Sequence, residues 1–200
     1  MAHEVIAPPY DVINAEEASD LAKGLPNSFL HVSRPEIDLE ENIQYNDPSV
    51  YEMGKQNLRR MIEDNVLIED AEDMIYLYEM IDDDIHQLGI AAVSSVEAYE
   101  ENLIKRHEFT KPDKELDRVN NISSLNAQTG PVLLTYRDNE KLSSLLEMIS
   151  DRESPIYDVK SIDGVVHRIY QVNQSEEQRE ILNLINSMDA LFIADGHHRS

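Results

Sequence analysis

The fold is decided by residues 74–93, MIYLYEMIDDDIHQLGIAAV. The first and last seven of these residues are rich in β-favouring side chains, and they flank the acidic turn Asp82-Asp83-Asp84. This arrangement predicts an antiparallel hairpin of two well-buried strands. A second hairpin is predicted for residues 156–162 and 165–172, because Asp163-Gly164 between them is a strong turn signal.

Outward from these hairpins, helical and extended patterns alternate along the chain. Apolar spacing and capping residues predict helices over residues 14–23, 49–65, 96–103, 112–126, 139–150 and 175–188, the last with a capping box from Ser175. Short strands are predicted at residues 29–32, 131–136 and 191–194. The pattern therefore predicts an α/β (α+β) fold with a mixed, partly antiparallel sheet and packed helices. We expect one domain over residues 1–200, or two small lobes of about 1–104 and 105–200.

The composition excludes several classes of function. The formal net charge is −23, from 40 acidic and 17 basic residues, so neither DNA nor RNA is expected as a partner. The absence of cysteine excludes disulfides, thiolate metal ligands and cysteine nucleophiles. No uninterrupted apolar stretch is long enough to span a membrane, and the first residues lack the pattern of a signal peptide. We therefore expect no membrane association and a cytoplasmic location. A homo-oligomer is compatible with this composition.

The segment Ala194-Asp195-Gly196-His197-His198-Arg199 carries the clearest chemical pattern. It should pass from a buried strand through a tight turn into a helix, whose first N–H groups attract anions. Gly196 allows close backbone approach, and the His and Arg side chains add donors. The pattern predicts a phosphate-binding turn at Asp195, Gly196, His197, His198 and Arg199. Two alternatives remain: a structural turn in which Asp195 caps the helix, and a His/Asp metal site that lacks clear companion ligands.

Two further polar segments could contribute to such a site. In the basic window 105–118, Lys111 and Arg118 could neutralise a second phosphate, and His107 or Glu108 could transfer a proton. The alternative is a surface loop that balances neighbouring glutamates. Near the start of the chain, two prolines hold Tyr10 and Asp11 in a stiff segment, so Asp11 could serve as a general base or metal ligand, or could simply begin the fold.

The common catalytic signatures are missing from the sequence. There is no Walker loop, no dinucleotide-binding GxGxxG after a strand, no GxSxG elbow, no HExxH and no EF-hand loop.

Several motifs in order resemble a known family. They are residues 8–13 (PPYDVI), 28–32 (SFLHV) with 34–36 (RPE), His107-Glu108 with Thr110, Lys114-Glu115 with Asp117-Arg118, residues 126–127 with 129–132, and residues 194–199 (ADGHHR). The set resembles the uncharacterised family named domain of unknown function 1015 (DUF1015). Because its members are typically about twice as long, the resemblance implies an N-terminal portion, with a clipped start and without the helix expected after Arg199.

The terminal turn is also similar to the phosphate-binding turn of the ParB and sulfiredoxin-like group, which includes free-serine kinases that use ADP and CTP-binding ParB proteins. This similarity implies a fold of that kind in the C-terminal part of the chain. It supports Gly196, His198 and Arg199 as phosphate contacts, and His197 and Asp195 less directly.

Together these patterns predict a protein that binds a nucleotide or another phosphorylated small molecule, with Mg²⁺ and ATP, ADP or CTP as candidate ligands. Three functions are compatible with this prediction or compete with it. The first reading is a kinase-like phosphotransferase with Asp11, His107 and Glu108 as catalytic candidates. The second is a non-catalytic regulatory or protein-interaction domain whose polar turns are structural. The third is a metal-dependent hydrolase.

Overall fold

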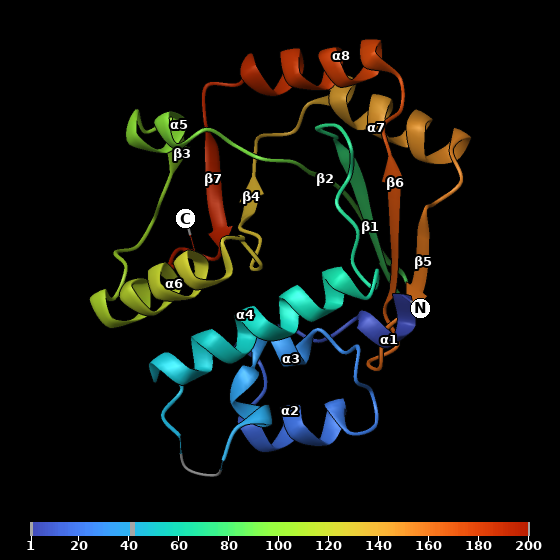
Figure 1. The fold of residues 1–200 in the computed structure, drawn as a ribbon. Coiled ribbons are helices and arrows are strands. Elements are labelled where there is room, and N and C mark those ends of the chain that lie inside the picture. Colours follow the sequence, from blue (N-terminus) through green and yellow to red (C-terminus); the bar gives the residue numbers. More distant parts are fainter. Residues whose placement is uncertain (1, 41–42, 200) are drawn as a thin grey trace. The chain divides into compact units, whose positions relative to one another are not determined.

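The computed structural model describes residues 2–40 and 43–199 and shows a mixed α/β fold, as predicted (Figure 1). These residues divide into two compact units, each assembled from separate segments. Unit 1 draws on Met1–Glu69, Thr110–Pro131 and His198–Ser200, and unit 2 draws on Asp70–Phe109 and Val132–His197. These boundaries differ from those of the two contiguous lobes expected from the sequence, because the chain crosses repeatedly between the units.

Unit 1 is helical in its described residues. Its elements are α1 (Ala2–Val5), α2 (Ala15–Ala22), α3 (Leu30–Ser33), the 3₁₀ helix η1 (Pro35–Asp38), α4 (Pro48–Glu63) and α6 (Pro112–Leu125). Helix α4 packs against α3 and α6, and its Met61 is buried with Val32 and Leu125 in one apolar cluster (Figure 1). A second cluster joins α2 to α3 through Ala18, Ala22 and Leu30. The long helix therefore connects the N-terminal segment to α6.

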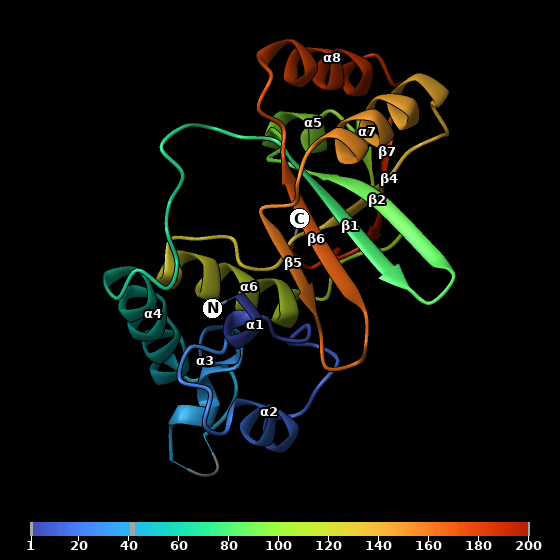
Figure 2. The same cartoon turned by 90° about the vertical axis from the view of Figure 1, so that its right-hand side faces the viewer.

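Unit 2 contains two sheets. Its elements are β1 (Tyr76–Asp82), β2 (Ile85–Ala91), α5 (Val96–Glu100), β3 (Ile104–Lys105), β4 (Leu133–Thr135), α7 (Glu140–Arg152), β5 (Tyr157–Lys160), β6 (Val166–Gln171), α8 (Ser175–Asn186) and β7 (Leu191–Asp195). The larger sheet has the order β2-β1-β6-β5 and is antiparallel throughout (Figure 2). The smaller sheet, β3-β7-β4, pairs β3 with β7 in parallel and β4 with β7 in antiparallel fashion.

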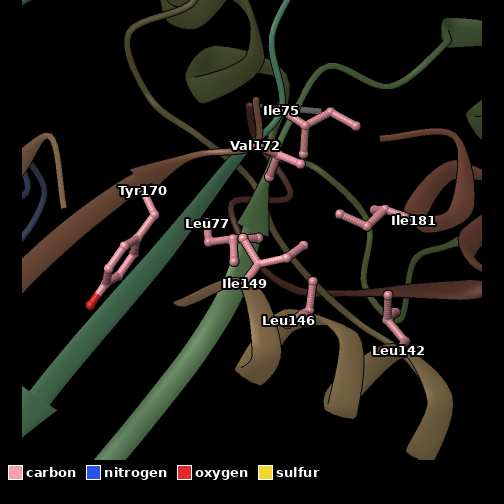
Figure 3. Close-up of a cluster of buried hydrophobic side chains, with 8 residues drawn as sticks. All are labelled: Ile75, Leu77, Leu142, Leu146, Ile149, Tyr170, Val172 and Ile181. Atoms are coloured by element: carbon pink, nitrogen blue, oxygen red, sulfur yellow. The ribbon is translucent and has the colours of Figure 1, made fainter. Parts of the chain in front are cut away.

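Strand periodicity places the core of unit 2 on one face of the larger sheet. Ile75, Leu77, Tyr170 and Val172 come from β1, β6 and their ends, and they meet Leu142, Leu146 and Ile149 of α7 and Ile181 of α8 (Figure 3). Ladder partners in an antiparallel sheet share a face, and every second residue of a strand does too. The same face therefore continues from Leu77 to Glu79, where it becomes polar.

Most predicted helices and both predicted hairpins are confirmed. Helix α2 begins with the expected Asn14 cap, whose side chain accepts from the N–H of Glu17 at 3.0 Å while the Glu17 carboxylate accepts from the N–H of Asn14. Two local predictions are wrong. Residues 29–32 were expected as a strand, but Leu30–Ser33 is helix α3, because so short a segment fits either period and its packing against α4 decides.

The second error concerns the start of α8. Ser175 was expected to cap this helix, but it is the first helical residue, and Gln174 occupies the cap position without a side-chain cap bond. In the first turn of α8, the Glu177 carboxylate accepts two hydrogen bonds from Arg152 of α7, at 2.7 and 2.8 Å, which tie this end of the helix to α7.

Candidate functional site

Tyr10 is the centre of a polar cluster in unit 1. It begins a turn after the extended residues 6–9, where the N–H of Val12 donates to the carbonyl of Pro9. The carbonyl of Tyr10 accepts from Nη1 of Arg34 at 3.2 Å, and Arg34 forms an ion pair with Glu36 at 2.9 Å. These contacts fix the tyrosine backbone in a part of the chain that has no helix or strand of its own.

Arg118 of α6 lies against the ring of Tyr10. Its guanidinium carbon is 4.4 Å from the ring centroid, which is within the range of a cation–π contact. Asp117 accepts from Nε and Nη2 of Arg118 at 3.0 and 2.5 Å, and its other oxygen accepts from the hydroxyl of Tyr51 at 2.7 Å. Burial, together with this hydrogen bond, raises the pKa of Tyr51 to about 12. Buried Asp117 therefore orients Arg118 toward Tyr10.

Arg199 of the ADGHHR segment approaches the same ring. Its guanidinium carbon is 6.0 Å from the Tyr10 centroid, and Nη2 is 4.0 Å from the Asp11 carboxylate. The carbonyl of Arg199 accepts from Nε2 of Gln128 at 3.0 Å. Gly130 lets the side chain pass, because a Cβ at this position would lie 2.9 Å from Cδ of Arg199. Three of the predicted site residues, Asp11, Arg118 and Arg199, are thus gathered around Tyr10.

Three other predicted residues meet in unit 2. Nδ1 of His197 lies 3.3 Å from the carboxylate of Glu108, and the rings of His107 and His197 are perpendicular with centroids 4.3 Å apart. Nδ1 of His107 lies 3.1 Å from the carbonyl of Ile193, so that nitrogen carries the proton. His197 is buried whereas Glu108 is exposed. The result is an imidazole pair with a carboxylate at its edge, an arrangement that can hold or pass a proton.

The remaining predicted residues are placed individually. Asp195 ends β7 opposite Leu133, and Gly196 follows with a φ of 92°, a left-handed conformation that favours glycine. Nε2 of His198 is buried and has no hydrogen-bond partner among the described residues. Lys111 is exposed at the start of α6. Residues 197–199 form a turn, and the helix expected after them falls outside the described residues.

Sequence reasoning missed a polar network in unit 2. Glu79 of β1 is buried, and its carboxylate accepts from the Tyr170 hydroxyl at 2.7 Å and contacts Nε2 of His86 at 2.5 Å and Nη1 of Arg168 at 3.5 Å. Burial alone would raise the pKa of Glu79, but these hydrogen bonds and charges hold it below its ordinary value. The sequence did contain a signal for the burial of Glu79, because alternation along the strand puts Glu79 on the same face as Leu77.

The comparisons with known proteins identify the family. The family model described as "Protein of unknown function (DUF1015)" matches residues 1–200. The chain belongs to the DUF1015 family. No curated protein and no solved structure matches this DUF1015 chain significantly. The similarity of its terminal turn to ParB and sulfiredoxin-like proteins stays a prediction.

The described residues of this DUF1015 chain contain neither a metal-binding cluster nor a membrane-spanning helix. Within residues 2–40 and 43–199, no three His, Cys, Asp or Glu side chains are grouped closely enough to hold a metal ion. Over the same residues, no helix has the length and apolar character that crossing a bilayer requires.

Proposed function

We propose that this chain binds a phosphorylated small molecule, such as a nucleotide, through Arg118 and Arg199 beside Tyr10. The observation that carries the proposal is the approach of two guanidinium groups to one tyrosine ring in a protein with a net charge of −23. Like charges repel, so their grouping favours an anion as the bound species. Guanidinium groups bind phosphate oxygens in a bidentate manner, which makes phosphate the best-matched anion.

The hydrogen bonding of Arg118 supports this assignment. Nε and Nη2 of Arg118 are used by Asp117, whereas its Nη1 makes no hydrogen bond to a described residue. The two N–H groups of Nη1 can therefore donate to an incoming oxygen. The ion pair between Arg199 and Asp11 is long, at 4.0 Å, which exceeds the length of a direct hydrogen bond.

Asp11 extends the proposal toward chemistry. The Asp11 carboxylate, 4.0 Å from Arg199, could hold Mg²⁺ together with ATP, ADP or CTP, because Mg²⁺ in such sites takes one or two carboxylates and the phosphate oxygens. In a kinase-like reaction with ATP, the oxygen of a substrate hydroxyl would bond to the γ-phosphorus of ATP, and ADP would leave. Asp11 would accept the proton that this hydroxyl loses. His107 and Glu108, in unit 2, remain further candidates for proton transfer.

Isothermal titration of the purified chain with ATP, ADP and CTP, with and without Mg²⁺, tests the proposal. Saturable binding of at least one nucleotide is expected. Arg199→Ala should weaken it at least tenfold, since one charge-assisted hydrogen bond contributes roughly 1.5–3 kcal/mol. Arg118→Lys should weaken it while still pairing with Asp117. Arg59→Ala removes an exposed arginine of the same unit and should leave the affinity unchanged.

A second candidate is a non-catalytic domain with structural polar turns, and the internal contacts of His197 with Glu108 and of Arg199 with Asp11 favour it. This alternative expects Arg199→Ala to lower the melting temperature without altering any ligand affinity. Absence of binding by every nucleotide at millimolar concentration, with the protein folded by circular dichroism, would reject nucleotide binding and leave this alternative.

A further inference from the structure

A pocket of about 630 Å³ lies in unit 2, and all of its lining residues belong to that unit. One side is the polar end of the larger sheet, with Glu79, His86 and Arg168, and the other is α7, with Glu147 and Asp151. The volume lies in the range typical of small-molecule sites. Its lining includes neither Tyr10 nor the two arginines beside that ring, which belong to unit 1.

The helix side of the pocket carries uncompensated negative charge. Glu147 and Asp151 are one turn apart on α7, so their carboxylates share a face of the helix and repel each other. Both residues are exposed, and neither forms an ion pair with a described residue. Ser143 and Ser150, on the same side of α7, add hydroxyl oxygens to the pocket lining.

The sheet side adds a fixed negative charge. Glu79 is only 7% exposed in its side chain, and Tyr170, His86 and Arg168 hold its carboxylate in place. Arg168 does not leave a free positive charge in the pocket, because it also forms an ion pair with Asp158 at 2.9 Å. The pocket lining thus contains three carboxylates, from Glu79, Glu147 and Asp151, and one arginine, Arg168. Arg168 already forms ion pairs with both Glu79 and Asp158.

We propose that this pocket binds a small organic cation with an aliphatic stem and primary ammonium groups. Glu147 and Asp151 would accept hydrogen bonds from the ammonium, and Leu88 and Leu146, which also line the pocket, would contact the stem. A single metal ion fits less well, since Glu79, Glu147 and Asp151 do not form a metal-ligating group. Tyr136, which is partly exposed and lines the pocket, adds an aromatic ring of the kind that attracts a cation.

The test is a titration of the isotope-labelled chain with cadaverine, followed by NMR and calorimetry at physiological ionic strength. Saturable binding at one site is expected, with the largest amide shifts in residues 143–151. The double variant Glu147→Gln/Asp151→Asn should weaken binding at least tenfold. The uncharged diol of the same chain length should not bind, because the carboxylates recognise the ammonium groups.

The matched control is Glu176→Gln/Glu180→Gln. It removes two exposed carboxylates one turn apart on α8, outside the pocket, and therefore changes the net charge of the protein equally. This variant should bind cadaverine within twofold of the unaltered chain. Equal weakening in both double variants would assign the effect to general surface charge and would overturn the proposal. Absent saturable binding, or displacement of cadaverine by equimolar Mg²⁺, would overturn it as well.

Discussion

At the scale of single residues, the buried carboxylates of Asp117 and Glu79 are each held by more than one neighbour. Asp117 accepts from both Arg118 and Tyr51, and Glu79 contacts Tyr170, His86 and Arg168. A buried carboxylate without such partners would be strongly destabilising, because its charge would lose the hydration that it has in the unfolded chain. Removing one partner is therefore expected to cost more than an exposed ion pair contributes.

Glu79 should make stability depend on pH. Its pKa in the folded protein lies below the ordinary value of 4.5, because the gains from Tyr170, His86 and Arg168 exceed the effect of burial. The stabilisation is therefore complete above pH 4.5 and is lost as pH falls through the lower, folded-state pKa. Glu79→Gln should lower the free energy of unfolding by roughly 1–3 kcal/mol at pH 7.

Urea unfolding of the unaltered chain and of the Glu79→Gln variant, at pH 7 and at pH 3, checks this prediction. The difference in unfolding free energy between the unaltered chain and the Glu79→Gln variant should be smaller at pH 3 than at pH 7, because the contribution of the lowered pKa declines below pH 4.5. A difference that stays constant between the two pH values would contradict the assigned cause.

Gly130→Ala should separate ligand binding from stability. The new Cβ would come within 2.9 Å of Cδ of Arg199, so the arginine side chain has to move away from its place beside Tyr10. We expect this overpacking to lower the free energy of unfolding by about 1 kcal/mol. The binding free energy of the nucleotide should fall by more than this amount. Thermal unfolding and the titration described above measure the two effects, and unchanged affinity would show that Arg199 does not contact the ligand.

At the scale of elements, the close packing of α4 against α3 and η1 depends on Gly54. A Cβ at this position would meet Cγ of Pro35 at 2.9 Å and the carbonyl oxygen of Val32 at 3.3 Å. Alanine is the better helix former by roughly 1 kcal/mol, so propensity alone predicts that Gly54→Ala stabilises the protein. The structure predicts the opposite sign, with a net loss of about 1–2 kcal/mol from overpacking.

Chemical denaturation of Gly54→Ala decides between propensity and packing. Gln56→Ala is a suitable control, because Gln56 is an exposed residue of the same helix. That variant should be neutral or slightly stabilising. An increase in stability of Gly54→Ala would show that α4 can shift away from α3 without cost.

Long amphipathic helices and both hairpins could be predicted from the sequence because their signals are local. Apolar spacing located α4 and α6, and Asp163-Gly164 located the turn between β5 and β6. The type of α3 could not be predicted, since a four-residue segment fits both periodicities and its packing partner α4 is distant in the sequence.

The candidate site was predictable only in its parts. Asp11, Arg118 and Arg199 were each identified from their local motifs. Their grouping around Tyr10 depends on contacts between segments far apart in the chain. The network at Glu79 was missed because its partners come from two other strands, β2 and β6, and the pairing register had to be known before Arg168 and Glu79 could be placed opposite each other.

At the scale of the whole molecule, the net charge of −23 dominates the electrostatics. Mutual repulsion of surface carboxylates destabilises a compact state, and salt screens it over a Debye length of about 10 Å at 0.1 M. We therefore expect the melting temperature to rise between 10 mM and 500 mM NaCl. Differential scanning calorimetry at pH 7 measures this shift, and a melting temperature that falls with salt would mean that attractive ion pairs outweigh the repulsion.

The interleaving of the two units has a consequence for biosynthesis. Tyr10, Arg118 and Arg199 belong to three segments of unit 1, and the stretches between these segments supply unit 2. A nascent chain that has left the ribosome only as far as Arg118 still lacks Arg199. It also contains only the first of the two segments of unit 2. The arginine pair beside Tyr10 is therefore completed only after both units have been translated, which would tie the proposed nucleotide binding to completion of the fold.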